Sequence, residues 1–364
     1  MNIGVDATRI TKKFITGVER YVFNMVNGLK LIDNLDHTFF FFVRKENENL
    51  LLNHRSDNIK IIPIVSRFFL DWYIYKYKVE VMHYTFIPPS VFPKRCSIVY
   101  TFHDVGRYFY PEMMSWGVKL YHNPLIKYNL KNISRIITVS QSAQRDIIKC
   151  LNFPHKKIDV IYNALPYELE TNHCSKSSSS VLHKFGIVKQ YLLSVGVYIP
   201  TKNITILLKA FNKLIESEKN IDLQLILVGR KGWYKEYLKY ISGANIILTG
   251  HVSDQELACL YKNAIVFIFP SLYEGFGMPL VEAMHFKTPI ICSSIPVHHE
   301  VCNDAALYFN SHDHLSLYHK IRELLNNEEL KHTLIKKGYN RSNLFSLEEF
   351  GKGLIECYEK AKGV

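Results

Sequence analysis

Short apolar segments of strand length alternate with amphipathic segments of helix length along almost all of this 364-residue chain. A parallel strand is reached from its neighbour only through a crossover, usually a helix, so this alternation indicates parallel sheets covered by helices. The predicted strands of the first series are residues 2–6, 38–44, 60–65, 79–84, 97–102, 135–140 and 157–162. Those of the second series are residues 191–197, 223–229, 246–250, 264–269 and 289–293. We therefore predict an α/β fold with two Rossmann-like sheets, whose ligands bind at the carboxyl ends of the strands.

A polar stretch separates the two series. It begins at Pro166 and contains the run Cys174-Ser-Lys-Ser-Ser-Ser-Ser, which is typical of a linker. A chain of this length also exceeds the size at which one hydrophobic core usually stops growing. We predict a first domain at residues 1–165, a linker at 166–184, a second domain at 185–345 and a separate C-terminal helix at 346–364.

The composition indicates the cellular compartment in which the protein is expected. The longest apolar runs, such as residues 38–43 and 264–270, are too short to span a membrane, and the first residues do not resemble a signal peptide. Seven cysteines without a C-x-x-C spacing indicate reduced thiols that serve as small core residues. We expect a cytoplasmic protein.

The net charge of +12 is concentrated in the first half, where residues 1–165 hold 23 Lys and Arg against 13 Asp and Glu. This excess predicts an anionic partner, either lipid or a phosphorylated acceptor, although solubility alone also explains it. Nucleic acid is disfavoured because no recognised nucleic-acid module is present. Within this half, residues 67–78 mix cations with large aromatic residues. They fit either a helix resting on a bilayer surface or a crossover helix packed on its sheet.

The segment 271–284, Ser-Leu-Tyr-Glu-Gly-Phe-Gly-Met-Pro-Leu-Val-Glu-Ala-Met, follows a buried strand and begins a predicted helix. Two carboxylates, Glu274 and Glu282, flank Gly275 and Gly277, and Pro279 suits the first helical turn. Glycines permit close approach of a ligand, and a helix N-terminus offers unpaired N–H groups to an anion. The segment therefore suits a ligand that carries hydroxyls and phosphates, such as a nucleotide sugar.

The pattern Glu274-x₇-Glu282 within EGFGMPLVEAM resembles the donor-site signature of retaining glycosyltransferases of family four, which have the GT-B fold. Further segments fall in the order in which that family has them, over nearly the whole chain. They are Thr16-Gly17-Val18-Glu19-Arg20-Tyr21, Thr101-Phe102-His103-Asp104, Val139-Ser140-Gln141-Ser142, Ser194-Val195-Gly196, Thr201-Lys202-Asn203, Val228-Gly229-Arg230-Lys231-Gly232-Trp233 and Thr288-Pro289-Ile290-Ile291. The resemblance implies two Rossmann-like domains facing across a cleft, and a C-terminal helix that returns to the first domain.

The resemblance assigns roles within the second domain. Glu274 would contact the C3 and C4 hydroxyls of the donor sugar, and Glu282 the ribose hydroxyls. The backbone N–H groups of Phe276 and Gly277 would hold the sugar or the diphosphate. The donor-binding residues implied here are Glu274, Gly275, Phe276, Gly277, Met278 and Glu282. The alternative is a helix-terminal acid stabilised by the macrodipole by about 0.3–1 kcal/mol, which would not require the glycines.

Lys202 follows a predicted strand, where a cation can neutralise the leaving phosphate as the sugar–phosphate bond breaks. Many family members pair this lysine with an arginine, but Val197 and Thr201 occupy the two usual places here. Arg230 is the first candidate to replace that arginine in donor binding, and Lys231 is the second. A solvated surface position is the alternative for Lys202 and for Arg230.

In the first domain, the resemblance places His103 near the reacting sugar, where it would bind the 6-hydroxyl or orient the acceptor. A histidine at the end of a strand also titrates near neutral pH. Asp104 would orient His103 or bind the acceptor, and Gly17 would approach the donor phosphate. A structural histidine and a plain tight turn are the alternatives for His103 and Gly17. There is no D-x-D motif, and the 298–300 segment lacks zinc-ligand spacing and predicts a loop, so we expect no metal and no other cofactor.

The resemblance implies a retaining transferase that moves a hexose from a nucleotide diphosphate sugar to a lipid-linked or saccharide acceptor, and the missing D-x-D motif predicts that it is metal-independent. The family pattern is most similar to bacterial mannosyltransferases of O-antigen or surface polysaccharide synthesis, so GDP-mannose is the expected donor. Peripheral contact with an anionic membrane is predicted for the basic first domain. The alternatives are a nucleotide-sugar epimerase of the same fold and a degenerate saccharide-binding member. The missing arginine favours the degenerate member, whereas the retained Glu274, Glu282, Lys202 and His103 oppose it.

Overall fold

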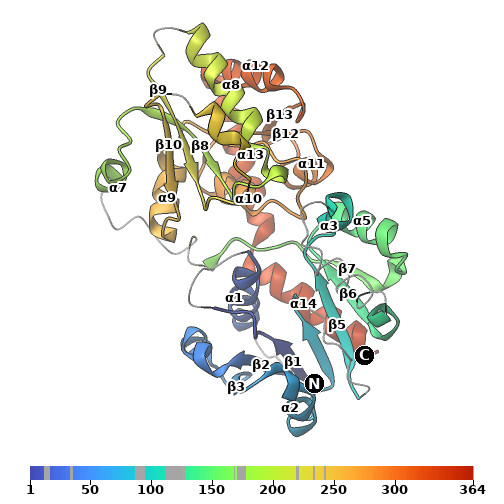
Figure 1. Cartoon of the computed structure of the whole chain (residues 1–364). Coiled ribbons are helices and arrows are strands. Elements are labelled where there is room, and N and C mark those ends of the chain that lie inside the picture. Colours follow the sequence, from blue (N-terminus) through green and yellow to red (C-terminus); the bar gives the residue numbers. More distant parts are fainter. Residues whose placement is uncertain are drawn as a thin grey trace. The chain divides into compact units, whose positions relative to one another are not determined.

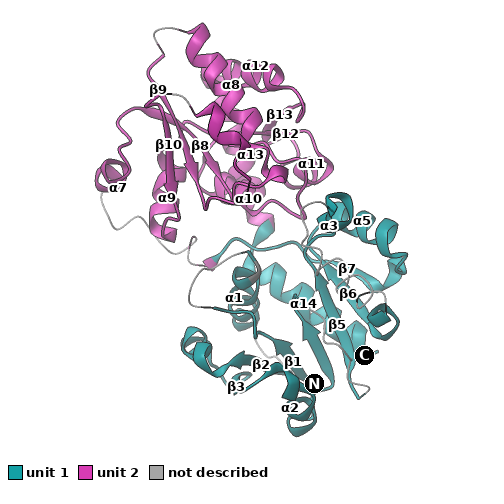
Figure 2. Ribbon diagram, in the orientation of Figure 1, with its two compact units in different colours: residues 1–166, 345–364 teal, residues 167–344 magenta. Residues whose placement is uncertain are grey.

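The computed structural model contains two compact units, coloured separately in Figure 2. Unit 1 comprises Met1–Pro166 and Phe345–Val364, and unit 2 comprises Tyr167–Leu344. The structure describes residues 1–11, 17–32, 36–86, 95–111, 126, 128–167, 169, 178–218, 221–232, 234–241 and 243–363. Within these ranges, no helix combines the length and the apolar character that crossing a membrane requires.

Unit 1 is built on a seven-stranded, fully parallel sheet with the order β3-β2-β1-β4-β5-β6-β7. Its strands are β1 (Asn2–Asp6), β2 (Thr38–Arg44), β3 (Ile59–Ile64), β4 (Val81–Tyr84), β5 (Ser97–Phe102), β6 (Arg135–Thr138) and β7 (Ile158–Val160). The direction of strand addition reverses between β1 and β4, which is the switch point at which such sheets bind ligands. The predicted strands of this unit are therefore all present. Four keep their predicted length, whereas β4 and β6 are shorter by two residues and β7 by three.

Most helices of unit 1 follow one of its strands along the chain, and the last is the C-terminal helix, as Figure 1 shows. They are α1 (Gly17–Lys30), α2 (Leu70–Lys76), α3 (Gly106–Phe109), α5 (Gln141–Leu151) and α14 (Leu347–Lys362). Short 3₁₀ turns lie at η1 (Lys45–Leu50), η2 (Leu52–His54), η3 (Arg67–Phe69), η5 (Leu130–Asn132) and η6 (His155–Lys157). Helix α5 begins at Gln141, because the Ser140 hydroxyl accepts the Ala143 N–H as an N-cap.

The C-terminal helix α14 returns to unit 1 and packs across α1, which confirms the prediction. The two helices approach closely at Gly28 and Gly351, where a Cβ on Gly28 would lie 2.5 Å from the Leu347 carbonyl oxygen. At the other end, the Tyr358 hydroxyl lies 2.7 Å from His83 Nδ1, a buried ring on β4. The helix is therefore an integral part of the core of unit 1.

Unit 2 contains a six-stranded parallel sheet with the order β10-β9-β8-β11-β12-β13, the same order as the first six strands of unit 1. Its strands are β8 (Gln190–Val195), β9 (Leu223–Val228), β10 (Ile246–Gly250), β11 (Val266–Phe269), β12 (Ile290–Ser293) and β13 (Ala306–Phe309). The switch point here lies between β8 and β11. Both units thus have a Rossmann-like arrangement, which confirms the predicted fold.

Helices cover the sheet of unit 2. They are α7 (Ser178–Lys184), α8 (Ile204–Ser217), α9 (Asp254–Asn263), α10 (Met278–His285), α11 (Pro296–Cys302), α12 (His314–Leu325) and α13 (Glu328–Ser342). The 3₁₀ turns η7 (Pro200–Lys202) and η8 (Glu236–Tyr240) lie within the unit, and η9 (Asn343–Phe345) precedes α14. Apolar residues on α8 and α12, such as Phe211 and Ile321, bury themselves against the strands.

Three predictions in this half of the chain were wrong or incomplete. The linker predicted at 166–184 contains α7, whose serines form the first helical turn while Val181 is buried and Lys184 pairs with Glu256. The loop predicted at 298–300 lies inside α11, which Pro296 begins. Strand β13 and helix α13 were not predicted, since β13 has only four residues and α13 is mostly polar.

Candidate active site

Lys202 and Glu274 form an ion pair at the switch point of unit 2. Lys202 ends η7, which follows β8, and Glu274 lies in the loop that follows β11, the strand next to β8. The Lys202 Nζ lies 2.5 Å from Glu274 Oε1, and the two side chains are 21% and 13% exposed. A backbone hydrogen bond of 2.7 Å from the Leu272 N–H to the Thr201 carbonyl joins the two loops. Residues 72 positions apart are thereby held at the strand edge where parallel sheets bind ligands.

Neighbouring residues hold Lys202 in place. Its ammonium lies 5.5 Å from the centre of the Phe269 ring at the end of β11, a cation–π contact. The next residue, Asn203, adopts a left-handed conformation with a φ of 53° and donates from its side chain to the Ser311 carbonyl at 2.8 Å. The cation is therefore positioned before any ligand arrives.

The glycine-containing loop leads into helix α10. Gly277 is the N-cap of α10 and has a φ of +104°, a backbone conformation that side chains disfavour. Met278 begins the helix, and Pro279 lies in its first turn as the sequence predicts. Phe276 is buried and anchors the loop. The N–H groups at the start of α10 follow the loop that carries Glu274.

Glu282 is buried on α10 and only 5% exposed. The hydroxyl of Tyr261, from α9, donates to Glu282 Oε2 at 2.9 Å. Tyr261 is fully buried and stacks on Phe286 at a ring distance of 5.7 Å, so its hydroxyl is fixed. The sequence indicated Glu282 but not Tyr261, which lies 21 residues earlier and shares no local pattern with it.

Arg230 and Lys231 follow β9 beside the loop that leads from β8 to Lys202. The Tyr198 N–H donates to the Arg230 carbonyl at 3.1 Å, and Tyr198 bridges to Lys231. The loops touch because Gly229 has no side chain: a Cβ there would lie 1.9 Å from the Gly196 carbonyl oxygen. Arg230 is half-buried and Lys231 is exposed. The structure therefore brings the backbone of both residues to the Lys202 loop.

Behind the ion pair lies a buried polar cluster that the sequence analysis missed. His298, on α11, is fully buried, and its Nδ1 lies 2.9 Å from the Ser293 carbonyl. Ser293 in turn donates to the Ser271 carbonyl at the start of the Glu274 loop. The His298 ring also packs on Phe269 at 5.2 Å. Burial first, and then the charge of the nearby Lys202, lower the pKa of His298 to about 3. The sequence analysis missed this cluster because it predicted a loop at residues 298–300.

His103 follows β5 in unit 1 and is half-buried. Its Nε2 lies 3.0 Å from the Thr85 carbonyl, which can only accept, so the ring carries its proton there and Nδ1 is left as the acceptor. The Tyr21 and His103 rings pack perpendicular to each other, with their centres 4.7 Å apart. Burial lowers the pKa of His103, which favours the neutral ring. No sequence pattern indicated the part played by Thr85.

Buried hydrogen bonds connect the residues beneath His103 to helix α14. The Tyr21 hydroxyl lies 3.1 Å from Thr101 Oγ1, which lies 2.7 Å from His83 Nε2. His83 Nδ1 contacts Tyr358, as described above. Burial lowers the pKa of His83 to about 3. The position of His103 therefore depends on the C-terminal helix.

The two other predicted residues of unit 1 have simpler surroundings. Asp104 is exposed, and its Oδ1 accepts the Gly106 N–H at 2.8 Å at the start of α3. Thr85, rather than Asp104, thus supplies the hydrogen bond that orients the His103 ring. Gly17 is the first residue of α1, and a Cβ there would meet nothing within 4 Å, so packing does not require a glycine. The roles predicted for both residues stay predictions.

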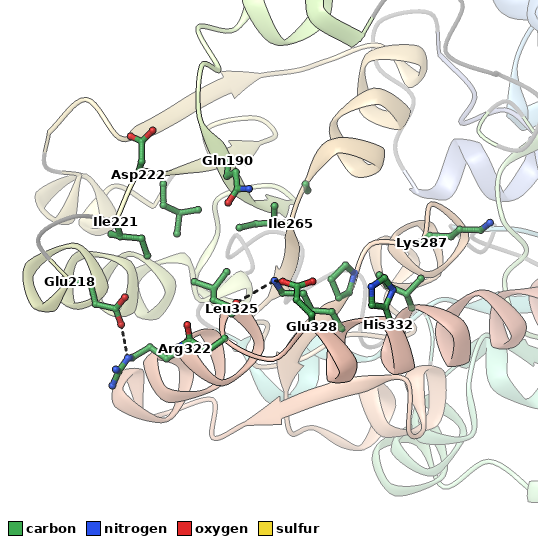
Figure 3. A pocket seen from close by; sticks show the side chains of 16 residues that line it. Gln190, Glu218, Ile221, Asp222, Ile265, Lys287, Arg322, Leu325, Glu328 and His332 are labelled. Carbon is green, nitrogen blue, oxygen red and sulfur yellow. Dashed lines mark hydrogen bonds and ion pairs between the residues drawn. The ribbon is translucent and has the colours of Figure 1, made fainter.

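Figure 3 shows a pocket in unit 2 whose lining includes none of the candidate site residues. Its lining includes Gln190, Leu223 and Pro289, which lie at the amino ends of β8, β9 and β12. Lys202 and Glu274 lie at the opposite, carboxyl ends. Two of its cations are already paired, Arg322 with Glu218 and Lys331 with Glu328. Over the described residues, no group of three or more His, Cys, Asp or Glu side chains could hold a metal ion.

Two parallel sheets of Rossmann order, with a charged pair and a glycine-containing loop at the second switch point, define the class of two-domain proteins with the GT-B architecture. Comparison with known proteins agrees. The family described as "Glycosyltransferase Family 4" matches residues 15–169, and "Glycosyl transferases group 1" matches residues 184–341. The chain therefore belongs to the family-four glycosyltransferases and is an enzyme of that class.

Individual relatives are similar over most of the chain. The O-antigen chain mannosyltransferase B of Escherichia coli is 27% identical over 98% of this chain and 99% of its own. The O-antigen chain mannosyltransferase RfbU of Salmonella typhimurium is 32% identical over 62% of this chain and 60% of its own. Among solved structures, HepE of Anabaena in complex with UDP-glucose has a TM-score of 0.75 and 16% identity, covering 98% of both chains. This last similarity concerns the fold alone.

Proposed function

We propose that this chain is a retaining mannosyltransferase that uses GDP-mannose to extend a surface polysaccharide. The observation that carries the proposal is the Lys202–Glu274 pair at the switch point of unit 2. The nucleotide donor offers a diphosphate to a cation and sugar hydroxyls to a carboxylate. A preformed pair of one cation and one carboxylate beside a helix N-terminus is complementary to both.

The pair performs two roles in the reaction. The Glu274 carboxylate accepts hydrogen bonds from sugar hydroxyls, which releases Lys202 to the diphosphate. As the sugar C1–O bond breaks, its electron pair moves to the phosphate oxygen, and Lys202 stabilises that charge. The acceptor oxygen then bonds to C1 on the same face, and its proton passes to the leaving phosphate. This front-face reaction needs no covalent intermediate.

Other residues complete the donor and acceptor sites. Arg230 supplies the second phosphate cation in place of the arginine absent at Val197 and Thr201, supported by its position beside the Lys202 loop. Glu282, oriented by Tyr261, binds the ribose hydroxyls. Neutral His103, oriented by Thr85, bonds the sugar 6-hydroxyl or the acceptor, since Nδ1 keeps a free lone pair for a hydroxyl donor. In this proposal Gly17 approaches the donor phosphate, Asp104 binds the acceptor, and Lys231 is the second candidate for the phosphate cation.

Mannose and polysaccharide are inferred from the relatives. Several of them carry names of O-antigen or serotype-specific mannosyltransferases. A UDP-hexose is the competing donor, because the similar fold of HepE was solved with UDP-glucose. The acceptor is a lipid-linked or saccharide chain, and the enzyme acts in the cytoplasm, with the basic unit 1 in contact with an anionic membrane.

The test is proton NMR of the enzyme with GDP-mannose or a UDP-hexose, first alone and then with a mannose-terminated oligosaccharide. We expect GDP-mannose to remain unchanged alone, and a new mannosyl linkage with the configuration of the donor to form once the acceptor is added. Conversion of the donor without an acceptor would identify an epimerase. Binding without any reaction would identify a saccharide-binding member and contradict the proposal.

A further inference from the structure

Four large aromatic side chains lie exposed on the short helical segment formed by η3 and α2 of unit 1. This aromatic face consists of Phe68, Phe69, Trp72 and Tyr75, which are 94%, 58%, 54% and 67% exposed. Phe68, Trp72 and Tyr75 follow a spacing of four and three residues, so they share one side of the helix. Exposed aromatic residues on a soluble surface are usually single, and a contiguous group marks an interaction site.

The opposite side of the same helix explains why these aromatic residues cannot turn inward. Leu70 and Ile74, four residues apart, are 3% exposed and pack in the core of unit 1. Tyr73 and Tyr77 lie against that core as well. The helix is thus already anchored to its sheet. Its buried side alone is enough for the crossover helix that the sequence allows. The aromatic face is additional to what the fold requires.

Cations surround the aromatic face. The Lys76 Nζ lies 4.9 Å from the centre of the Trp72 ring, and the Arg95 guanidinium lies 5.3 Å from the Tyr75 ring. Lys78 is exposed at the end of the helix. Arg67 is not part of this charge, because it pairs with Asp6 at 2.6 Å.

Few carboxylates offset these cations. Asp71 is exposed within the segment. Glu80, beyond it, is paired with Lys362 at 3.3 Å. The aromatic face and its three cations therefore form a positively charged, partly apolar surface.

We propose that the aromatic face binds the surface of an anionic lipid bilayer. Aromatic rings are stable at the depth of the lipid headgroups, and the surrounding cations are complementary to anionic headgroups. A second copy of this chain is a poorer occupant, because a symmetric contact would place the cations of one copy against those of the other. The inference rests on the proposed function in one respect: a lipid-linked acceptor gives the enzyme a reason to remain at the bilayer.

The test is sedimentation of the full-length enzyme with vesicles of phosphatidylcholine alone or with 30% phosphatidylglycerol. The wild type is expected to bind the anionic vesicles, less strongly as salt is raised, and to bind neutral vesicles much less. The double variant Phe68→Ser/Trp72→Ser, and separately Lys76→Glu/Arg95→Glu, should each lower the apparent affinity at least tenfold. The matched control Val188→Ser/Leu315→Ser removes exposed apolar residues of unit 2 and should change nothing.

Three outcomes would overturn the inference. They are absence of wild-type binding to anionic vesicles, unchanged binding of Phe68→Ser/Trp72→Ser, and a wild-type dimer that this variant converts to a monomer. Transfer to a water-soluble oligosaccharide, measured on the same samples, separates this inference from the proposed function. Normal transfer without vesicle binding refutes the surface alone. Vesicle binding without transfer refutes the mannosyltransferase alone.

Discussion

The sheets of the two units share the same order over six strands, and each unit has an ion pair at its switch point. The two pairs differ in how many hydrogen bonds the carboxylate already accepts. In unit 1, Asp6 at the end of β1 accepts from Thr8 N, Thr8 Oγ1 and two nitrogens of Arg67. In unit 2, Lys202 is the one side chain among the described residues that bonds the Glu274 carboxylate. A saturated carboxylate serves the fold, whereas a carboxylate with acceptor capacity left can serve a ligand.

The largest effect is expected from Glu274→Ala. Loss of charge-assisted hydrogen bonds to two sugar hydroxyls, at about 1.5–3 kcal/mol each, should lower kcat/KM about 10²–10⁴-fold. The melting temperature should stay close to that of the wild type, because Glu274 bonds no group of the core. The control is Glu236→Ala, which breaks an exposed ion pair with Lys239 in the same unit. A folded Glu274→Ala enzyme with normal turnover would remove Glu274 from the donor site.

Asp6→Ala should show the reverse behaviour. It leaves Arg67 and Thr8 without their shared acceptor in a site where Asp6 is only 5% exposed. We expect the free energy of unfolding to fall by about 3 kcal/mol, near the lower limit for breaking a buried pair because Arg67 retains some access to water. Donor affinity should change little. Chemical denaturation and donor titration of the same sample measure both quantities. A normal stability with lost donor binding would show that the two switch points have been assigned the wrong way round.

A smaller effect concerns pH. His83 in unit 1 and His298 in unit 2 each have a pKa lowered to about 3 by burial, against an ordinary value of about 6.5. Between these values the unfolded chain binds the extra proton, so stability is complete above pH 6.5 and falls as the pH is lowered towards 3. Between pH 7.5 and pH 5, each histidine should reduce the unfolding free energy by about 2 kcal/mol.

Single histidine variants show how much of this pH dependence comes from each unit. His298→Asn and His83→Asn should each remove one contribution to the difference between pH 7.5 and pH 5. The exposed His312→Asn should remove neither. Denaturant unfolding at both pH values measures the difference. If the His298 and His83 variants retain the full wild-type difference, other groups cause it.

The sequence predicted what is encoded locally. The apolar runs gave the parallel strands, and Gly277 with Pro279 marked the start of α10, because glycine and proline restrict the backbone within a few residues. Helix α11 was missed because seven residues are too few to show a helical period, although Val297 and Val301 are buried four positions apart. Contacts across the fold, such as Lys202 with Glu274, Glu282 with Tyr261 and Asp6 with Arg67, leave no local signal. The family resemblance indicated Lys202 and both glutamates, but only the structure shows that Glu274, unlike Asp6, keeps acceptor capacity for a ligand.

The central claim is that the Lys202–Glu274 pair is a preformed donor site, and ligand-induced stabilisation tests it most directly. Thermal unfolding of the wild type and of Lys202→Met should be followed with GDP, GDP-mannose, UDP and UDP-glucose, with Lys213→Met on the exposed face of α8 as the control. A ligand at a hundredfold excess over its Kd stabilises the native state by about 2.7 kcal/mol. We predict that GDP-mannose raises the melting temperature of the wild type and of Lys213→Met, and that Lys202→Met loses most of this shift. An equal shift in Lys202→Met, or no shift with any of the nucleotides, would contradict the account.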